Sequence, residues 1–290
     1  MKKIIFIISF LLFNISFSQN RLVVPLISAI KKGNTTSYNY DGVDFYKEET
    51  KLVFNKKNIK RILKEYRIKK KERKIIDTIL NPLRYRIIRS ENTEEASINF
   101  IKNENNLIDV FAFSYFGKNN IKFENEMISI SNKIPVKEFE SYRAINVNFI
   151  NRKLELGGNC SWMSVNNIQC PGYGQMNWSV HKTSKGAQNA IDNQLNNTKS
   201  KKGTKIISEE FVDIIFENVP TKSKKIILKI TGLNGSLVSL TGGKYLTIYY
   251  VQQKIRGNYV SCVLSFWNND NINESGLPSL LEEVMSLKTQ

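Results

Sequence analysis

The chain has 290 residues, of which 43 are Lys or Arg and 26 are Asp or Glu, so its formal net charge at pH 7 is +17. Hydrophobic residues make up 41% of the sequence. This is enough apolar material for a packed core and excludes wholesale disorder, collagen-like and coiled-coil architectures. His181 is the only histidine, so a zinc site built from several histidines is excluded, and any Ser-His-Asp or Cys-His catalytic site would have to use His181.

The first 18 residues have the features of a secretory signal peptide. Lys2 and Lys3 precede an apolar run over residues 4–13, and a Ser-Phe-Ser sequence then places the cleavage site before Gln19. The apolar run is too short to span a membrane as a helix. We therefore expect an exported protein, periplasmic or extracellular, whose mature chain contains no transmembrane segment.

Export changes the interpretation of the three cysteines. In an oxidising compartment Cys160 and Cys170, with nine residues between them, predict a disulfide that closes a short loop. Two free thiols or a bond between chains are the alternatives. Cys262 alternates with Val260 and Leu264, which predicts a buried thiol in a strand. The spacing fits neither a four-cysteine zinc site nor a CxxC redox motif, so the sequence predicts no metal ion and no cofactor.

Segments rich in β-branched and aromatic residues fill most of the N-terminal half, and stretches of Asn, Gly, Glu and Lys separate them. This pattern predicts strands. The expected strands cover residues 42–47, 51–55, 84–90, 97–102, 107–116, 127–131 and 144–156. Residues 107–116 are nearly all apolar and predict a central strand buried on both faces. We expect residues 19–156 to form one α+β unit, an antiparallel sheet with a long helix.

Positive charge is concentrated between Lys56 and Lys74, where 11 basic residues accompany two acidic ones. Apolar residues recur at helical spacing before and after the densest charge. The pattern predicts a long basic helix over residues 55–80, ended by Asn81-Pro82 because proline disfavours helical geometry in the residue before it.

The densest part of this segment contains Lys69, Lys70, Lys71 and Lys74. These lysines are either a solvated helix face or a docking site for an anionic surface or polymer, such as an acidic polysaccharide, lipid headgroups or extracellular nucleic acid. Sequence-specific nucleic-acid recognition is not expected, because the segment has few side chains suited to reading bases and the chain is exported.

Residues 157–290 predict a second α+β unit in the order β-α-β-β-β-β-α. Its first strand ends at His181, Ser184 is the expected N-cap of its first helix, and residues 196–203 form a connector rich in Lys and Asn. The later elements are strands at residues 211–219, 225–231, 245–254 and 259–267, a tight turn at Gly257-Asn258, and an amphipathic terminal helix over residues 277–287.

Residues 160–181 combine aromatic, amide and imidazole side chains. Trp162, Tyr173, Gln175 and His181 are the candidate binding residues, because aromatic rings stack on ligands and amides give directional hydrogen bonds. The alternative is a structural loop held by the disulfide. A copper site is not expected, since Met176 and His181 point to opposite faces of one strand.

No catalytic residues are predicted. The sequence has no GxSxG motif, and a lone histidine on the polar face of a strand is typical of a surface residue. The favoured interpretation is an exported, non-catalytic binding or envelope-associated accessory protein made of two α+β units. The alternative is a hydrolase of cell-envelope or extracellular polymers, with two acids that come from distant segments.

Overall fold

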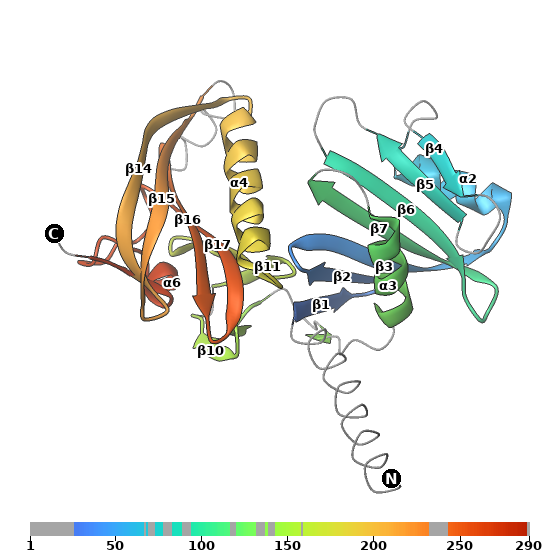
Figure 1. Ribbon diagram of the computed structural model, residues 1–290, viewed down its shortest axis with the longest axis horizontal. Coiled ribbons are helices and arrows are strands. Elements are labelled where there is room, and N and C mark those ends of the chain that lie inside the picture. Colours follow the sequence, from blue (N-terminus) through green and yellow to red (C-terminus); the bar gives the residue numbers. More distant parts are fainter. Residues whose placement is uncertain are drawn as a thin grey trace, which may run out of the picture.

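The computed structural model describes residues 26–66, 68, 73–77, 83–88, 94–116, 120–131, 137–138, 143–157, 159–231 and 243–288. The expected signal peptide lies outside these residues. Two separate, mainly antiparallel sheets make up most of the described chain, and a few helices pack on them (Figure 1). The predicted α+β class is therefore confirmed.

The N-terminal sheet has the strand order β4-β5-β6-β7-β3-β2-β1-β8. Its strands are β1 (Ile27–Lys32), β2 (Thr35–Tyr40), β3 (Val43–Val53), β4 (Arg73–Asp77), β5 (Leu83–Ile88), β6 (Glu94–Lys102), β7 (Leu107–Phe116) and β8 (Lys137–Glu138), and its helices are α2 (Lys56–Glu65) and α3 (Ile121–Ser131). Neighbouring strands are antiparallel except for β1 and β8. We refer to this sheet and its helices as the N-terminal lobe.

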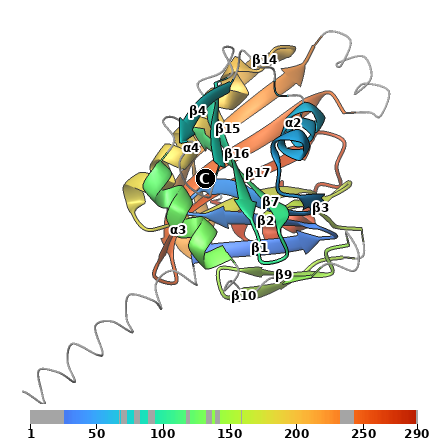
Figure 2. The ribbon, with the colours of Figure 1, turned by 90° about the vertical axis from the view of Figure 1, so that its right-hand side faces the viewer.

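Strand β7 lies in the middle of this sheet, as its apolar sequence predicts. Ile108 and Val110 pack with residues of α2, whereas Phe111 and Phe113 pack with residues of α3. Since side chains alternate between the faces of a strand, the two helices cover opposite faces of the sheet (Figure 2).

Residues 127–131 were expected to be a strand, but they form the second half of α3. Asn120 Oδ1 accepts the backbone N–H of Phe123 at 3.1 Å and caps the start of the helix. Phe123, Met127 and Ile130 then recur at helical spacing and pack on the sheet. The short apolar run fits either period, so the prediction of a strand is wrong because the cap upstream decides the outcome.

The long basic helix predicted over residues 55–80 is also wrong. Asn55 accepts the backbone N–H of Asn58 at 2.9 Å and caps α2. The helix nevertheless ends at Glu65, and residues 73–77 are strand β4.

The β-branched pair Ile75-Ile76 suits a strand, and Ile75 pairs with Tyr85 of β5. A run of like charges before this pair disfavours a continuous helix, because residues three and four apart repel one another. Of the four lysines singled out in the sequence, Lys69, Lys70 and Lys71 lie outside the described residues, and Lys74 lies in β4.

The C-terminal sheet has the strand order β11-β12-β13-β17-β16-β15-β14-β18, with antiparallel neighbours throughout. Its strands are β11 (Ser161–Ser164), β12 (Asn167–Cys170), β13 (Gly174–His181), β14 (Thr204–Phe216), β15 (Val219–Ile230), β16 (Tyr245–Ile255), β17 (Asn258–Trp267) and β18 (Met285–Leu287). Helix α4 (Ser184–Ser200) packs on one face, and α6 (Ser279–Glu282) with the hairpin β9 (Asn146–Phe149) and β10 (Arg152–Glu155) packs on the other. We refer to these elements as the C-terminal lobe.

Among the described residues, the element order from β13 to α6 is the predicted β-α-β-β-β-β-α. Strands β11 and β12 precede it in the same sheet, and the strand predicted over residues 211–219 spans the turn at Glu217-Asn218 between β14 and β15. Three further details differ. Helix α4 continues through residues 196–200, which were expected to be a connector. The terminal helix ends at Glu282, because residues 285–287 pair with β14 instead. Arg256 and Gly257, with φ of 46° and 82°, form the turn one residue earlier than predicted.

The hairpin β9–β10 belongs to the core of the C-terminal lobe, although the sequence groups residues 144–156 with the N-terminal unit. The ring of Phe149 lies edge-on to Trp178 at a centroid distance of 5.5 Å. The Glu217 side chain, 2% exposed, forms ion pairs with Arg152 and Arg256, and Arg256 also donates to the backbone carbonyl of Phe149. These contacts hold the hairpin against the sheet.

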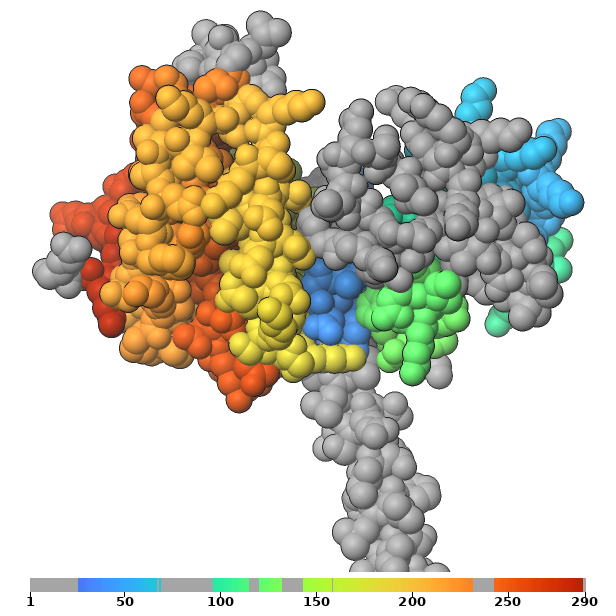
Figure 3. All heavy atoms as spheres, turned by 45° about the horizontal axis from the view of Figure 1, so that its top comes forward, coloured from blue at the N-terminus to red at the C-terminus, as the bar shows by residue number. Residues whose placement is uncertain are grey.

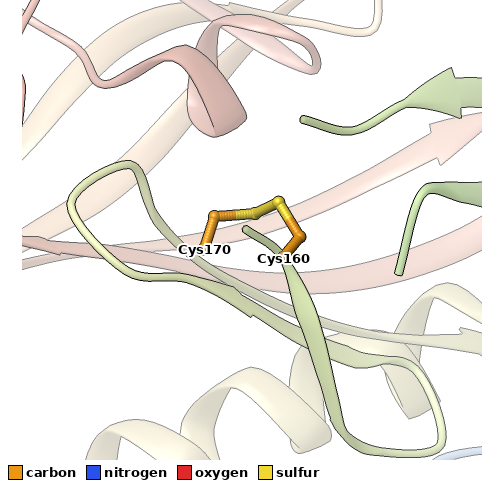
Figure 4. Close-up of a disulfide and its surroundings, with 2 residues drawn as sticks. All are labelled: Cys160 and Cys170. Carbon is orange, nitrogen blue, oxygen red and sulfur yellow. A yellow bond between two sulfur atoms is a disulfide. The ribbon is translucent and has the colours of Figure 1, made fainter. Parts of the chain in front are cut away.

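The predicted disulfide between Cys160 and Cys170 is confirmed (Figure 4). It joins the chain before β11 to the end of β12, and both cysteines lie in the core of the C-terminal lobe. Cys262 in β17 is a free, fully buried thiol, as its alternating pattern predicts. Burial raises the pKa of this thiol well above its usual value.

Strand β14 has an open side for much of its length. β18 pairs only with residues 214–216, so among the described residues, 204–212 have a strand partner on the β15 side alone. The pairing of β14 with β15 shifts register between Ile206 and Ser208, which marks a β-bulge. Ile207 and Phe211 are 48% and 62% exposed on this stretch.

Candidate functional site

The two lobes meet where the turn between β2 and β3 contacts the end of β13. Asp41 and Gly42 form this turn with positive φ angles of 52° and 79°. The backbone N–H of Lys182 donates to Asp41 Oδ1 at 3.1 Å. A Cβ atom on Gly42 would lie 2.5 Å from Cε1 of His181, so only glycine permits this approach.

His181 is buried in the joint between the lobes, with 2% of its surface exposed. Its Nε2 lies 2.9 Å from Ser179 Oγ and 2.8 Å from Ser261 Oγ, and the two hydroxyls are 2.7 Å apart. Its Nδ1 lies 3.6 Å from Asp41 Oδ1 and has no hydrogen-bond partner among the described residues. The expectation of a surface histidine is therefore wrong, because the polar face of β13 faces the joint and not the solvent.

These residue types are those of a serine hydrolase, but their arrangement suits a structural joint. Ser179 and Ser261 are 6% and 2% exposed, and each is bonded to the other as well as to His181. The backbone of Gly42 packs on the imidazole ring, so closely that an added Cβ would lie 2.5 Å from Cε1 of His181. The network therefore satisfies buried polar groups and fixes the contact between the lobes.

A cleft of about 1220 Å³ lies beside this joint. One wall comes from the N-terminal sheet and the other from α4, and Figure 3 shows blue residues of the N-terminal lobe beside the yellow residues of α4. Its lining consists mostly of polar and charged side chains: Asn39, Asp41, Asp44 and Ser114 from the N-terminal lobe, and Asn177, Ser179, His181, Asn189, Asn193, Gln194, Asn197, Thr198, Ser200, Lys201 and Lys202 from the C-terminal lobe.

Helix α4 presents a row of amides to the cleft. Asn189, Asn193 and Asn197 recur at every fourth residue, so they lie on one face of the helix, with Gln194 beside them. The opposite face carries Ala187 and Ile191, which are buried against the C-terminal sheet. Each amide offers both donors and acceptors, so the row can bind a ligand that carries both.

The facing wall is acidic. Asp44 is accessible from the cleft, and Asn39 donates to its Oδ1 at 2.7 Å. The surrounding protein raises the pKa of Asp44 by removing water from around the carboxylate, an effect that the Asn39 hydrogen bond opposes. Lys201 and Lys202 lie in the lining beyond the C-terminal end of α4. The cleft therefore has carboxylates on one lobe and ammonium groups on the other.

Of the binding residues singled out in the sequence, His181 alone is among those that line this cleft. Trp162 is half-buried against the core of the C-terminal lobe, 6.2 Å from the ring of Trp178. Tyr173, 37% exposed, lines a separate pocket of about 310 Å³ beside the disulfide. Gln175 donates to Asn167 Oδ1 at 3.1 Å within the sheet.

The amide row and the acidic wall were not predicted from the sequence. The signal for the amide row was present, since asparagines at every fourth residue on a helix opposite its apolar face are unusual where Lys and Glu commonly lie. No comparable signal marked Asn39, Asp41 and Asp44, which look like ordinary turn residues in the sequence.

Two negative findings apply to the described part of the chain. No three His, Cys, Asp or Glu side chains gather as ligands of a metal ion would. No helix in the described ranges is both long and apolar enough to cross a membrane.

Comparison with known proteins gives no family. No family model matches the chain, and no curated protein matches it. A chain of the crystal structure of the Tle4-Tli4 complex is 11% identical with a TM-score of 0.25, and the match covers 91% of this chain and 98% of that one. The di-domain ARO/CYC StfQ from the steffimycin biosynthetic pathway is 8% identical with a TM-score of 0.16, covering 89% of this chain and 77% of that one. Both likenesses are too weak to support an argument about fold or function.

Proposed function

We propose that the protein is an exported, non-catalytic binding protein and that the cleft between its lobes binds an extended polypeptide segment. The observation that supports this most directly is the amide row on α4, opposite the acidic wall of the N-terminal lobe. A disulfide and the expected signal peptide agree with a periplasmic or extracellular location.

The spacing of the amide row suits a peptide backbone. Four residues of helix rise about 6 Å, and two residues of an extended peptide rise about 6.7 Å. Successive amides of Asn189, Asn193 and Asn197 can therefore pair with successive backbone groups on one edge of an extended segment, with small adjustments of side-chain torsions. The described lining residues include no Phe, Tyr or Trp, so they offer no large aromatic face on which a sugar ring could stack.

We favour binding over hydrolysis because the cleft is lined by polar groups that can recognise a ligand, whereas the histidine that a hydrolase would use is buried. His181 lies below Gly42, and both serines beside it are buried. The carboxylates Asp41 and Asp44 belong to one short hairpin on the same wall, whereas a glycosidase places its two acids on opposite sides of the scissile bond.

The proposal is tested by selecting random displayed peptides on the mature wild-type protein and measuring their affinity for variants. In the variant Asn189→Ala, Asn193→Ala, Asn197→Ala, each substitution removes an amide but favours the helix. We expect the selected peptides to bind this variant about tenfold more weakly or worse, since each lost hydrogen bond is worth about 1 kcal/mol.

The matched control is Asn196→Ala, which changes an exposed asparagine of the same helix that is not among the cleft residues. It should leave the affinity unchanged. Equal affinity of the triple variant and the wild type would overturn the proposal, as would selection of glycans but no peptides from a mixed library.

A second proposal concerns the basic surface of α2. Ile59, Ile62 and Leu63 are buried against the sheet. The outward face carries the exposed residues Lys56, Lys57, Lys60, Arg61 and Lys64. Attraction of this face to an anionic envelope surface or polymer would concentrate the protein there without a membrane-spanning segment.

A further inference from the structure

We infer that the wall of the cleft around Asp44 binds a positively charged group of the ligand, an ammonium or a guanidinium carried on a basic side chain. This inference rests on the proposed function and specifies the chemistry of the ligand at one point of the cleft.

Asp44 lies at the junction of two hollows. With Ser114 it lines the polar cleft, and the same two residues line an adjoining pocket of about 270 Å³. In β3 and β7 these residues are directly paired, so their side chains are on the same face of the sheet. Apolar and aromatic residues, among them Tyr46, Tyr66 and Ile68, form much of the adjoining pocket. A ligand group at Asp44 therefore meets a carboxylate at one side and an apolar surface at the other.

Asn39 adds a second acceptor at this point. It is 5% exposed, lines the cleft, and its Nδ2 donates to Asp44 Oδ1. The carboxylate fixes the orientation of the amide, because the reverse orientation would set two acceptors against each other. The Oδ1 of Asn39 is left without a hydrogen-bond partner among the described residues. A buried acceptor without a hydrogen-bond partner is unfavourable unless a ligand supplies a donor.

The charge of Asp44 is also uncompensated. Among the described residues, no Lys or Arg forms an ion pair with it, although the whole chain carries a net charge of +17. Its neighbour Asp41 differs, since the Lys182 ammonium, which lies 4.9 Å from the centre of the Tyr40 ring, interacts electrostatically with Asp41. The raised pKa of Asp44 agrees with a carboxylate that lacks a nearby cation.

A basic side chain suits the carboxylate of Asp44, the unpartnered oxygen of Asn39 and the apolar surface of the adjoining pocket. Its cationic head donates several hydrogen bonds, which suits a carboxylate and an amide oxygen that are both acceptors. Its aliphatic stem is apolar and can lie along the adjoining pocket. A neutral donor such as glutamine would supply the hydrogen bonds without the charge.

The test uses three probes: a glycine-flanked peptide with one central arginine, the same peptide with glutamine in its place, and agmatine as a free guanidinium. Binding is measured by titration calorimetry on the mature protein. We expect the arginine peptide to bind the wild type about tenfold more tightly than the glutamine peptide. In Asp44→Asn, which keeps the acceptor for Asn39, the two peptides should bind equally, whereas in the control Asp192→Asn, an exposed residue outside the lining, the preference should persist.

The outcomes separate the two proposals. Equal binding of both peptides to the wild type, together with loss of both in the triple asparagine variant of α4, would overturn the cationic site and leave the proposed function standing. A preference for arginine that persists in Asp44→Asn would also overturn the site. Agmatine that binds as tightly as the arginine peptide would support the cationic site while contradicting a polypeptide ligand.

Discussion

Glu217 shows how one buried carboxylate can organise segments that lie far apart in the sequence. It follows β14. Its partner Arg152 is the first residue of β10, and its partner Arg256 lies in the β16–β17 turn. Two guanidinium groups form ion pairs with this one carboxylate, so removing it leaves two arginines without their partner. The energetic effect is thus larger than that of an exposed ion pair.

We expect Glu217→Ala to lower the free energy of unfolding by about 3 kcal/mol, the lower end for a buried pair because both arginines are about a third exposed. The control Glu210→Ala removes a carboxylate that is 51% exposed and paired with Lys225, and should cost less than about 1 kcal/mol. Chemical denaturation followed by circular dichroism measures both. Similar losses in the two variants would contradict this role of Glu217.

Among the helices and strands, those with long and regular sequence patterns were predicted correctly. Strand β7 was predicted because its residues are nearly all apolar, and the pair β16–β17 was predicted because two long strand-like segments flank a glycine turn. Helix α3 and strand β4 were missed because their apolar runs are short and fit both periods. In these cases Asn120 at the helix start and the pairing of Ile75 with Tyr85 decide the structure.

The basic surface of α2 gives a prediction at this scale. Replacing Lys56, Lys57, Lys60 and Lys64 by Gln should lower the salt concentration at which the protein elutes from a heparin column. The control replaces four exposed lysines elsewhere, Lys153, Lys205, Lys222 and Lys254, and so removes the same charge. If position matters, the α2 variant elutes clearly earlier than the control. Elution of both variants at the same salt concentration would show that binding to heparin depends on net charge alone.

For the molecule as a whole, the joint between the lobes could not be predicted from sequence. Asp41 and Lys182 are 141 residues apart and meet only in the assembled fold. The alternating pattern of β13 correctly indicated a polar face containing His181, but it does not distinguish a face toward solvent from a face toward a second lobe. The cleft could not be predicted from the sequence for the same reason, since its two walls come from different lobes.

Gly42→Ala tests the joint directly. Its positive φ disfavours alanine by about 1–2 kcal/mol, and the added Cβ would also press on His181. Gly33→Ala isolates the first effect, because Gly33 has a φ of 57° and no atom within 4 Å of the added Cβ. We expect Gly42→Ala to be the less stable variant and to have a larger radius of gyration by small-angle X-ray scattering. Equal stability and identical scattering would contradict a tight joint at this glycine.

The open side of β14 is a place at which chains could associate at high concentration. An unpaired strand edge with Ile207 and Phe211 exposed is a template on which further chains could add and grow into fibrils. The bulge after Ile206 interrupts the regular spacing of backbone groups that such growth requires. Lys205, Glu209 and Glu210 add charge along the same stretch. We therefore expect the irregular, charged edge to resist such growth while its apolar residues remain at the surface.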